Sequence, residues 1–323
     1  MAPRTHLPVR EVAALAALTD RLSGLDREGV AEFFSGSDAV EITDLIRATS
    51  DEELGRLVAE DDFRAEGITA ILQRFAEFAD ADRLASLDGV VCFDLSRPDG
   101  PNERHTARFA HGRVTLEDVP GDVTIRAAVV DFVRLVTGQS NAALLYLSGG
   151  LGITGDALLA LDVGSVFRLP GSGAVAVDPT ALDPVDVATA IKDVPRGHLA
   201  EVMGGAFRDL VVGEVFRRFP EFLDQQKAQR QRLHIGFHIS GRPDGGADRF
   251  IVHVADGSCT VEADPPQGAE RDATLLLDGP DFLRLVTGHV NPVRALMTGR
   301  LKLKGDRAKA LAFNAVMDPP KAR

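Results

Sequence analysis

The chain has 323 residues, more than a single hydrophobic core usually organises, so its length alone predicts two domains. Hydrophobic residues make up 45% and charged residues 26% of the sequence, proportions typical of a soluble globular protein. The formal net charge of -12 argues against a general nucleic-acid-binding surface, because such surfaces carry large basic patches.

The amino-terminal segment predicts a helical extension over residues 1–34. Val12, Leu15, Leu18 and Leu22 recur at helical spacing, and no later part of the chain matches this segment. The first ten residues lack the apolar core of a signal peptide, and no stretch is long and apolar enough to span a bilayer. We therefore expect a cytoplasmic protein without a transmembrane segment.

An internal repeat dominates the rest of the chain. DFVRLVTG at 131–138 recurs as DFLRLVTG at 281–288, an offset of 150 that holds without a gap to Asp156 and Asp306. RFAEFAD at 74–80 matches RFPEFLD at 218–224, with an offset of 144 that also carries Phe93 onto Phe237. Units of this length are too long for a solenoid repeat, so each copy should be a complete domain.

The join between the copies is visible as residues 170–184, which are rich in Pro, Gly and small residues. We therefore predict a first domain over 35–169, a linker over 170–184, and a second domain over 185–323.

The second copy shows the expected elements most clearly. Apolar residues at spacings of three and four predict a helix over 205–223. Strands are expected at 233–239, 249–257, 258–264 and 273–279, with Asp256-Gly257 forming a hairpin turn. Helices at 280–287 and 292–298, a strand at 300–305 and a helix capped by Asp306 complete the unit. This order predicts an α+β fold in which a small mixed or antiparallel five-stranded sheet, covered by helices, occurs twice.

Three motifs resemble binding or catalytic signatures, but a structural role is favoured for each. Gly150, Gly152 and Gly155 fit the dinucleotide-binding spacing, but the second copy has Arg300 and Lys302 at the first two positions, so we favour an edge strand. GQSNA at 138–142 only approaches a nucleophile elbow. Asp156 and Asp306 are repeated acids, and helix capping explains both.

Metal and disulfide sites are also not favoured. His234, His238 and His253 would lie on neighbouring strands, where solvent-facing histidines are more frequent than ligands. Cys92 and Cys259 fall at non-equivalent positions of the repeat, which argues against a designed disulfide. We expect no metal and no cofactor.

Two groups of cations have alternative interpretations. Arg134 and its repeat partner Arg284 could meet a fatty-acid carboxylate or a CoA phosphate, although an exposed helix face is favoured. A single basic patch could contact anionic lipid headgroups, and a solvated strand edge explains it equally well. That patch comprises Arg300, Lys302, Lys304, Arg307 and Lys309.

The segment DFLRLVTGHVNPVRALMTGRLKLKGDRAKAL resembles the carboxy-terminal half of sterol carrier protein-2 (nonspecific lipid-transfer) domains. The final strand running into Gly-Asp and a helix is GRLKLKGD in copy two and GGLGITGD in copy one. The resemblance covers about 65–170 and 209–320. It implies a small mixed sheet covered by helices, with an apolar tunnel that holds a sterol, fatty acid or acyl-CoA.

Candidate residues for such a tunnel are the apolar positions of the late helices and the last strand. For any single one of them, ordinary core is the more frequent role. In copy two they are Phe282, Leu285, Val286, Leu296, Met297, Leu301, Leu303, Leu311 and Val316. In copy one they are Phe132, Leu135, Val136, Leu144, Leu147, Leu151, Ile153 and Leu161.

These observations predict a non-enzymatic intracellular carrier of lipid. The alternative is a ligand-free scaffold that binds a protein partner in lipid metabolism, and a catalytic acyl-CoA or sterol-modifying enzyme is a third hypothesis. Copy two is the better candidate for lipid binding, because GGLGITGD departs further from the family pattern. The last residues, Lys-Ala-Arg, differ from a peroxisomal Ser-Lys-Leu signal.

Overall fold

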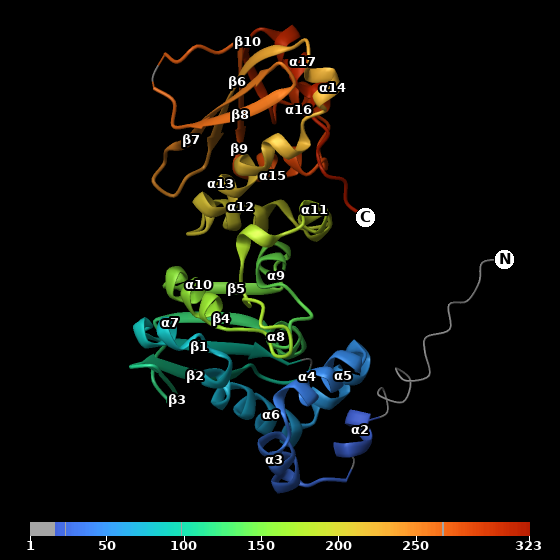
Figure 1. Cartoon of the computed structure of the whole chain (residues 1–323), viewed down its shortest axis with the longest axis vertical. Helices are drawn as coiled ribbons and strands as arrows, with labels where there is room; N and C mark the ends of the chain where they lie inside the picture. Colours follow the sequence, from blue (N-terminus) through green and yellow to red (C-terminus); the bar gives the residue numbers. More distant parts are fainter. Residues whose placement is uncertain (1–16, 23, 98, 267) are drawn as a thin grey trace, which may run out of the picture. The chain divides into compact units, whose positions relative to one another are not determined.

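The computed structural model describes residues 17–22, 24–97, 99–266 and 268–323, and it divides into two units (Figure 1). Unit 1 holds the described residues up to Tyr146 together with Gly150–Asp178, and unit 2 holds Leu147–Gly149 and Pro179–Arg323. Leu18 and Leu22 of the expected amino-terminal helix are buried, whereas Val12 and Leu15 lie outside the described residues. The domain limits of 35–169, 170–184 and 185–323 stay predictions.

Unit 1 begins with helices whose ends are set by capping side chains. Asp26, Asp38 and Ser50 accept hydrogen bonds from the first-turn amides of α3, α4 and α5, and Ser50 forms a capping box with Glu53. The helices before the sheet are α2 (Ala17–Leu22), α3 (Arg27–Gly36), α4 (Ala39–Ala48), α5 (Asp51–Ala59), α6 (Asp61–Gln73), η1 (Phe75–Phe78) and α7 (Ala81–Ser86).

The sheet of unit 1 has five strands in the order β3-β2-β1-β4-β5. Its strands are β1 (Gly89–Ser96), β2 (Glu103–Ala110), β3 (Arg113–Leu116), β4 (Val123–Ala128) and β5 (Leu151–Gly155). β1 and β4 are parallel, and the other neighbours are antiparallel. Helices α8 (Val129–Val136) and α9 (Ala142–Ser148) precede β5, and α10 (Ala157–Val166) follows it.

Unit 2 repeats this arrangement with the strand order β10-β9-β6-β7-β8. Its strands are β6 (Arg232–Ser240), β7 (Ala247–Ala255), β8 (Ser258–Ala263), β9 (Ala273–Asp278) and β10 (Lys302–Gly305). Its helices are η2 (Pro179–Ala181), α11 (Pro184–Ile191), α12 (Arg196–Gly204), α13 (Arg208–Arg218), η3 (Phe219–Phe222), α14 (Gln225–Ala228), α15 (Gly279–Val286), α16 (Pro292–Met297) and α17 (Arg307–Val316).

The α+β class and the two mixed five-stranded sheets are confirmed. In both units the central strand pairs in parallel with the strand that precedes the late helices, β1 with β4 and β6 with β9. A parallel pair needs a long connection, and an antiparallel hairpin supplies it here in each unit. The glycine-containing segment GLGITG forms the edge strand β5, as expected.

Local signals also match the structure closely. Asp256 and Gly257 both have positive φ, 52° and 76°, as a tight hairpin between β7 and β8 requires. Asp156 accepts hydrogen bonds from Leu158 and Leu159 amides, and Asp306 does so from Ala308 and Lys309. Both acids are therefore helix caps.

The helix predicted over 205–223 is shorter than expected. The α-helix covers Arg208–Arg218, and Phe219–Phe222 form a separate 3-10 turn. Pro220 has no amide hydrogen and its ring would collide with the carbonyl four residues earlier, so it disfavours continuation of the helix. Phe75–Phe78 of unit 1 form the same turn without a proline, so the turn belongs to the fold of the repeat.

Candidate functional site

The helix-facing side of the unit 2 sheet carries a cluster of phenylalanine rings. Phe216 of α13 stacks on Phe282 of α15 with ring centroids 5.3 Å apart, and it meets Phe237 of β6 edge-on. Phe313 of α17 lies 6.0 Å from Phe237. Phe216 and Phe282 are among the most deeply buried side chains. Three helices therefore meet the sheet through aromatic pairs, each worth about 0.5–1.5 kcal/mol beyond burial.

Unit 1 builds the same interface from equivalent positions. Phe93 of β1 contacts Phe132 of α8 at 5.4 Å and Phe75 of η1 at 5.9 Å between ring centroids. These three residues correspond in the repeat to Phe237, Phe282 and Phe219. Where unit 2 has Phe216, unit 1 has the fully buried Leu72, so its aromatic cluster is smaller at this point.

The candidate lining residues lie in three kinds of environment. Phe282, Leu301, Val316, Phe132, Leu147 and Leu151 are buried. Leu285, Val286, Leu296, Leu303, Leu135, Val136, Leu144, Ile153 and Leu161 are partly exposed. Met297 and Leu311 are exposed, at 84% and 55% of their surface. The buried phenylalanines are core residues of the helix–sheet interface, and a role in lining a lipid tunnel stays a prediction for the whole set.

Two exposed apolar side chains lie on α16 of unit 2. Met297 is 84% exposed. Val293, one turn before Met297, is 49% exposed. Residues four apart share a helix face, so these two side chains form one apolar surface.

The repeated arginines of the late helices have a structural role. Arg134 is 8% exposed and donates to the carbonyls of Ile46 and Thr49, at 2.8 and 2.6 Å, and to Asp51. Arg284 donates to the carbonyl of Val194, the residue equivalent to Thr49. The prediction of an exposed helix face is therefore wrong for Arg134, because its guanidinium fixes α8 to the carboxyl end of α4.

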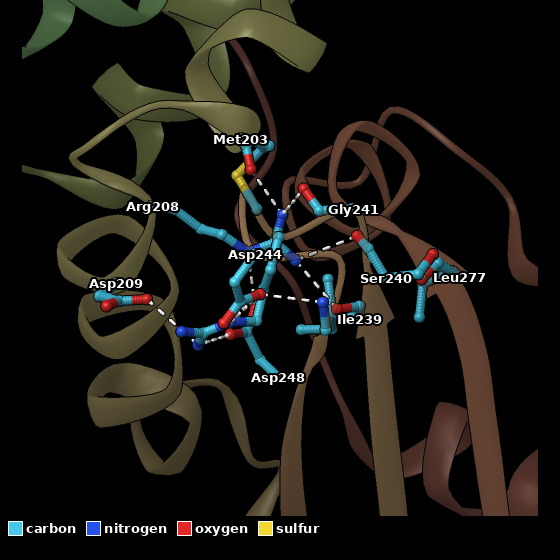
Figure 2. Close-up of polar contacts among 11 residues, drawn as sticks. Met203, Arg208, Asp209, Ile239, Ser240, Gly241, Asp244, Asp248 and Leu277 are labelled. Carbon is cyan, nitrogen blue, oxygen red and sulfur yellow. Dashed lines mark hydrogen bonds and ion pairs between the residues drawn. The ribbon is translucent and has the colours of Figure 1, made fainter.

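A buried ionic cluster, not anticipated from the sequence, lies at the start of α13 (Figure 2). Arg208 is 2% exposed, and its Nε donates to Asp248 at 2.8 Å. Its Nη atoms donate to the carbonyls of Met203, Ile239, Ser240 and Gly241. All five N–H groups of the guanidinium are thus used within the protein, which leaves none for a ligand.

The acid of this cluster has a second partner. Arg242 donates to Asp248 at 2.8 Å and to Asp244 at 3.2 Å, and these contacts raise the pKa of Arg242. The Asp248 side chain therefore lies between two guanidinium groups.

Unit 1 contains the equivalent cluster. Arg64 is 3% exposed and donates from Nε to Glu103 at 2.9 Å, while Arg97 pairs with the same carboxylate. Arg64 and Arg208 differ by the same offset of 144 that relates RFAEFAD to RFPEFLD, ten residues upstream of that match. Extension of the repeat to these positions was the signal that could have identified them.

The histidines and cysteines do not converge. His234 and His253 face each other on β6 and β7 with ring centroids 4.9 Å apart, and His253 contacts Glu262 at 3.3 Å. Across the part of the chain that the structure describes, no three His, Cys, Asp or Glu side chains are grouped to hold a metal ion. Cys92 and Cys259 are both buried free thiols.

The basic patch follows the edge strand β10 and the start of α17. Arg300, Lys302, Lys304 and Arg307 are exposed, whereas Lys309 donates to the carbonyl of Arg232 at 2.7 Å. Contact of this patch with anionic lipid stays a prediction. Within the described ranges, no helix combines the length and apolar composition needed to cross a membrane.

Comparison with known proteins places both units in one family. The model of the SCP-2 sterol transfer family matches residues 68–168 and 216–318. Among curated proteins, sterol carrier protein 2 of Gallus gallus is 32% identical over 126 residues, which are 39% of this chain and 22% of that protein. Hydroxysteroid dehydrogenase-like protein 2 of Xenopus tropicalis is 24% identical over 110 residues, which are 34% of this chain and 25% of that protein.

Among solved structures, sterol carrier protein 2 from Yarrowia lipolytica in its apo form is 21% identical, with a TM-score of 0.23. That match covers 41% of this chain and 96% of the other. The chain matches only about a quarter of the length of the two curated relatives. Because the family model matches once in each unit and together over more than half of the residues, the chain belongs to the SCP-2 sterol transfer family.

Proposed function

We propose that the protein is a lipid carrier in which a sterol, fatty acid or acyl-CoA occupies an apolar tunnel between the sheet and the late helices. The observation that carries this proposal is the SCP-2 family match, which spans the sheet and late helices of each copy. Membership in this family implies lipid binding or transfer in general. The relatives named sterol carrier protein 2 support the choice of lipid as cargo.

The partly exposed apolar residues of the late helices are the proposed contact surface in unit 2. Leu285, Val286, Leu296 and Leu303 retain exposure that a bound apolar chain would remove. Each methylene buried against them contributes roughly 0.8 kcal/mol, so a fatty chain needs an apolar surface and few polar contacts. This explains why binding requires no short sequence signature.

The proposal includes no catalytic step and no cofactor. Asp306 caps α17, Arg208 is saturated by protein groups, and Asp248 is paired twice. The hydroxysteroid dehydrogenase-like relatives match over only about a quarter of their length. We also propose a cytoplasmic location, supported by two free cysteines.

Native mass spectrometry of the full chain, followed by organic extraction and lipid identification, tests the proposal directly. A co-purifying sterol, fatty acid or acyl-CoA supports the carrier and names its cargo class. Protein that is empty and also fails to take up a fluorescent fatty acid contradicts it.

Paired substitutions locate the binding unit. Leu285→Asp in unit 2 and Leu135→Asp at the equivalent position of unit 1 place a charge on the proposed surface, so the affected unit should lose most of its fatty-acid uptake. Leu158→Asp is the matched control, because Leu158 is already 67% exposed. Thermal unfolding of each variant separates loss of binding from loss of fold.

A second function, a scaffold without lipid, is favoured by two observations on unit 2. The stacked Phe216 and Phe282 occupy the helix–sheet interface, and Val293 and Met297 present an apolar face outside it. A scaffold predicts that Met297→Glu abolishes association with a protein partner without changing stability. A carrier predicts that the same variant keeps its lipid content unless α16 borders the tunnel entrance.

A further inference from the structure

A polar cleft of about 420 Å³ opens on unit 1 beside the first turns of α5 and α8. Its walls come from the α4–α5 connection, including Ser50 and Asp51, and from α8 with the turn after it, including Asp131 and Ser140. A volume of this size accommodates a small organic molecule. None of the residues that line this cleft belongs to the proposed lipid-contact set.

Almost every charge in the cleft already has a partner. Arg134 pairs with Asp51 at 2.7 Å, and its remaining donors go to carbonyls and to Gln139. Arg47 donates to the carbonyls of Thr137 and Pro170 and pairs with Asp44. The carboxylate of Asp131 has no hydrogen-bond or ion-pair partner among the residues that the structure describes.

The environment of Asp131 disfavours its charge. Partial burial, and to a smaller extent the neighbouring Asp51, raise the pKa of Asp131 above its ordinary value. The positive charge of a bound cation would offset both effects.

Unit 2 shows what the equivalent carboxylate binds. Asp281 corresponds to Asp131 at the offset of 150, and it is 4% exposed. Its Oδ1 lies 2.9 Å from Nη1 of Arg196 and 3.5 Å from Nε of Arg300. These contacts are ion pairs without hydrogen-bond geometry, because Oδ1 accepts no hydrogen bond. Two guanidinium groups therefore lie beside this carboxylate in unit 2, and one of them, Arg196, also pairs with Asp278.

Unit 1 has neither of these cations at the equivalent positions. Helices α5 and α12 begin at equivalent positions, where Asp51 stands in place of Arg196. Gly150 stands in place of Arg300, and a Cβ built on Gly150 would lie 3.0 Å from Cδ2 of Leu145 and 3.8 Å from Oδ2 of Asp131. Neither of the two guanidinium groups found beside Asp281 therefore has a counterpart beside Asp131.

We propose that this cleft binds an organic cation that carries N–H donors, an ammonium or guanidinium group, through the carboxylate of Asp131. The bound group takes the place that Arg196 and Arg300 occupy beside Asp281. Charge-assisted N–H···O⁻ contacts are short and about twice as strong as neutral ones, so an N–H donor is preferred to a quaternary ammonium. The cation belongs either to a free small amine or to the headgroup of a lipid.

Chemical-shift perturbation of backbone amides in the full-length protein tests this proposal at millimolar ligand. Ethanolamine is compared with choline, which has the same charge and no N–H donor on nitrogen. The expected result is saturable shifts at Ser50, Asp131 and Ser140 with ethanolamine and much smaller shifts with choline. Lysophosphatidylethanolamine against lysophosphatidylcholine repeats the comparison for a headgroup. Larger shifts with ethanolamine than with choline, and no difference between the two lysolipids, identify a free amine as the ligand. A difference between the two lysolipids alone identifies a lipid headgroup.

Two variants remove the site by different means. Asp131→Asn deletes the charge, and Gly150→Arg supplies the guanidinium that unit 2 has, so each should weaken amine binding by about ten-fold or more. Asp82→Asn, an exposed acid in the first turn of α7, is the control and should bind as the wild type does. Equal shifts with ethanolamine and choline, or unchanged binding by Asp131→Asn, overturn the proposal. Because Gly150→Arg retains the carboxylate, it tests the site even if Asp131→Asn alters the fold.

Discussion

Nε of Arg208 donates to Oδ2 of Asp248 at 2.8 Å, and the two side chains are only 2% and 7% exposed. Arg64 and Glu103 form the same contact in unit 1 at 2.9 Å. The pair thus persists in both copies although the acid differs by one methylene. Burial of two charges is unfavourable unless they are paired and fully hydrogen-bonded, and the four backbone carbonyls around Arg208 meet that requirement.

Removal of one partner should therefore destabilise unit 2 strongly. We expect Arg208→Met to lower the free energy of unfolding by about 3–5 kcal/mol, because it leaves Oδ2 of the buried Asp248 and four backbone carbonyls without their donor. Urea unfolding followed by far-ultraviolet circular dichroism measures this loss. Arg217→Ala breaks a surface pair with Glu214 and should change stability by less than about 1 kcal/mol. Similar losses in both variants would contradict the role of the buried cluster.

The last strand of each copy ends at a glycine that no other residue can replace without strain. Gly305 has φ of 94°, and a Cβ there would lie 2.4 Å from the carbonyl oxygen of Asp272. Gly155 in unit 1 has φ of 95° and the same 2.4 Å approach to Asp122. The Gly-Asp sequence at the end of the last strand therefore combines a turn that requires glycine with a helix cap.

Alanine substitutions at Gly305 and at a glycine inside a helix should change stability in opposite directions. We expect Gly305→Ala to destabilise unit 2 by at least about 1–3 kcal/mol, from the positive φ together with the steric clash. Gly213→Ala lies inside α13 with open space around it and should stabilise the unit by about 0.5–1 kcal/mol. The unfolding temperatures of the two variants should thus shift in opposite directions relative to the wild type. Shifts in the same direction would contradict the predicted steric clash at Gly305.

Much of the fold could be predicted because periodic patterns and turn residues act locally. The alternation of Leu233, Ile235, Phe237 and Ile239 matches the buried face of β6. Asp256-Gly257 predicted the hairpin between β7 and β8, and Asp306 predicted the start of α17. Both features are present in the structure. The repeat then extended each assignment to the other copy.

The site was harder to predict because it depends on contacts between distant segments. An arginine at the start of a helix is ordinarily exposed, and the carbonyls that bury Arg208 come from Ile239, Ser240 and Gly241, about thirty residues later. Helical spacing placed Met297 on an apolar face, yet spacing does not reveal whether that face meets protein or solvent. Periodicity therefore identifies faces, and tertiary contacts decide what covers them.

The carboxyl group of Asp131 should make stability depend on pH in an unusual direction. Its pKa is raised in the folded protein, mainly by partial burial, so the native state binds its proton more tightly than the unfolded chain does. Stability therefore falls as pH rises from about 3.9, the unfolded pKa, through the folded pKa. At neutral pH the ionised group remains a constant unfavourable contribution.

Asp131→Asn should remove that contribution. We expect a higher unfolding temperature than wild type at pH 7, and a difference that shrinks towards zero below about pH 4, where the carboxyl is protonated in both states. Asp51 and Arg134, the charged groups near Asp131, are the same in both proteins, so the difference isolates one carboxyl. A difference of the same size at pH 3 and pH 7 would contradict this assignment.

The buried thiol of Cys259 should react slowly with alkylating reagents in the folded protein. Cys259 is 9% exposed on β8, and burial raises its pKa to about 11. The thiolate is the reactive form, so at pH 8.5 the fraction available is roughly one hundred-fold lower than in the unfolded chain, where the pKa is about 8.5.

Iodoacetamide labelling of the Cys92→Ala variant, followed by mass spectrometry, measures the rate at this single thiol. Cys92 is the other of the two free cysteines, so its removal leaves one reactive sulfur. We expect labelling at pH 8.5 to be about one hundred-fold or more slower in buffer than in urea. Labelling at comparable rates in the two solutions would mean that the β7–β8 hairpin opens readily, and that β8 does not hold Cys259 in the core as its burial indicates.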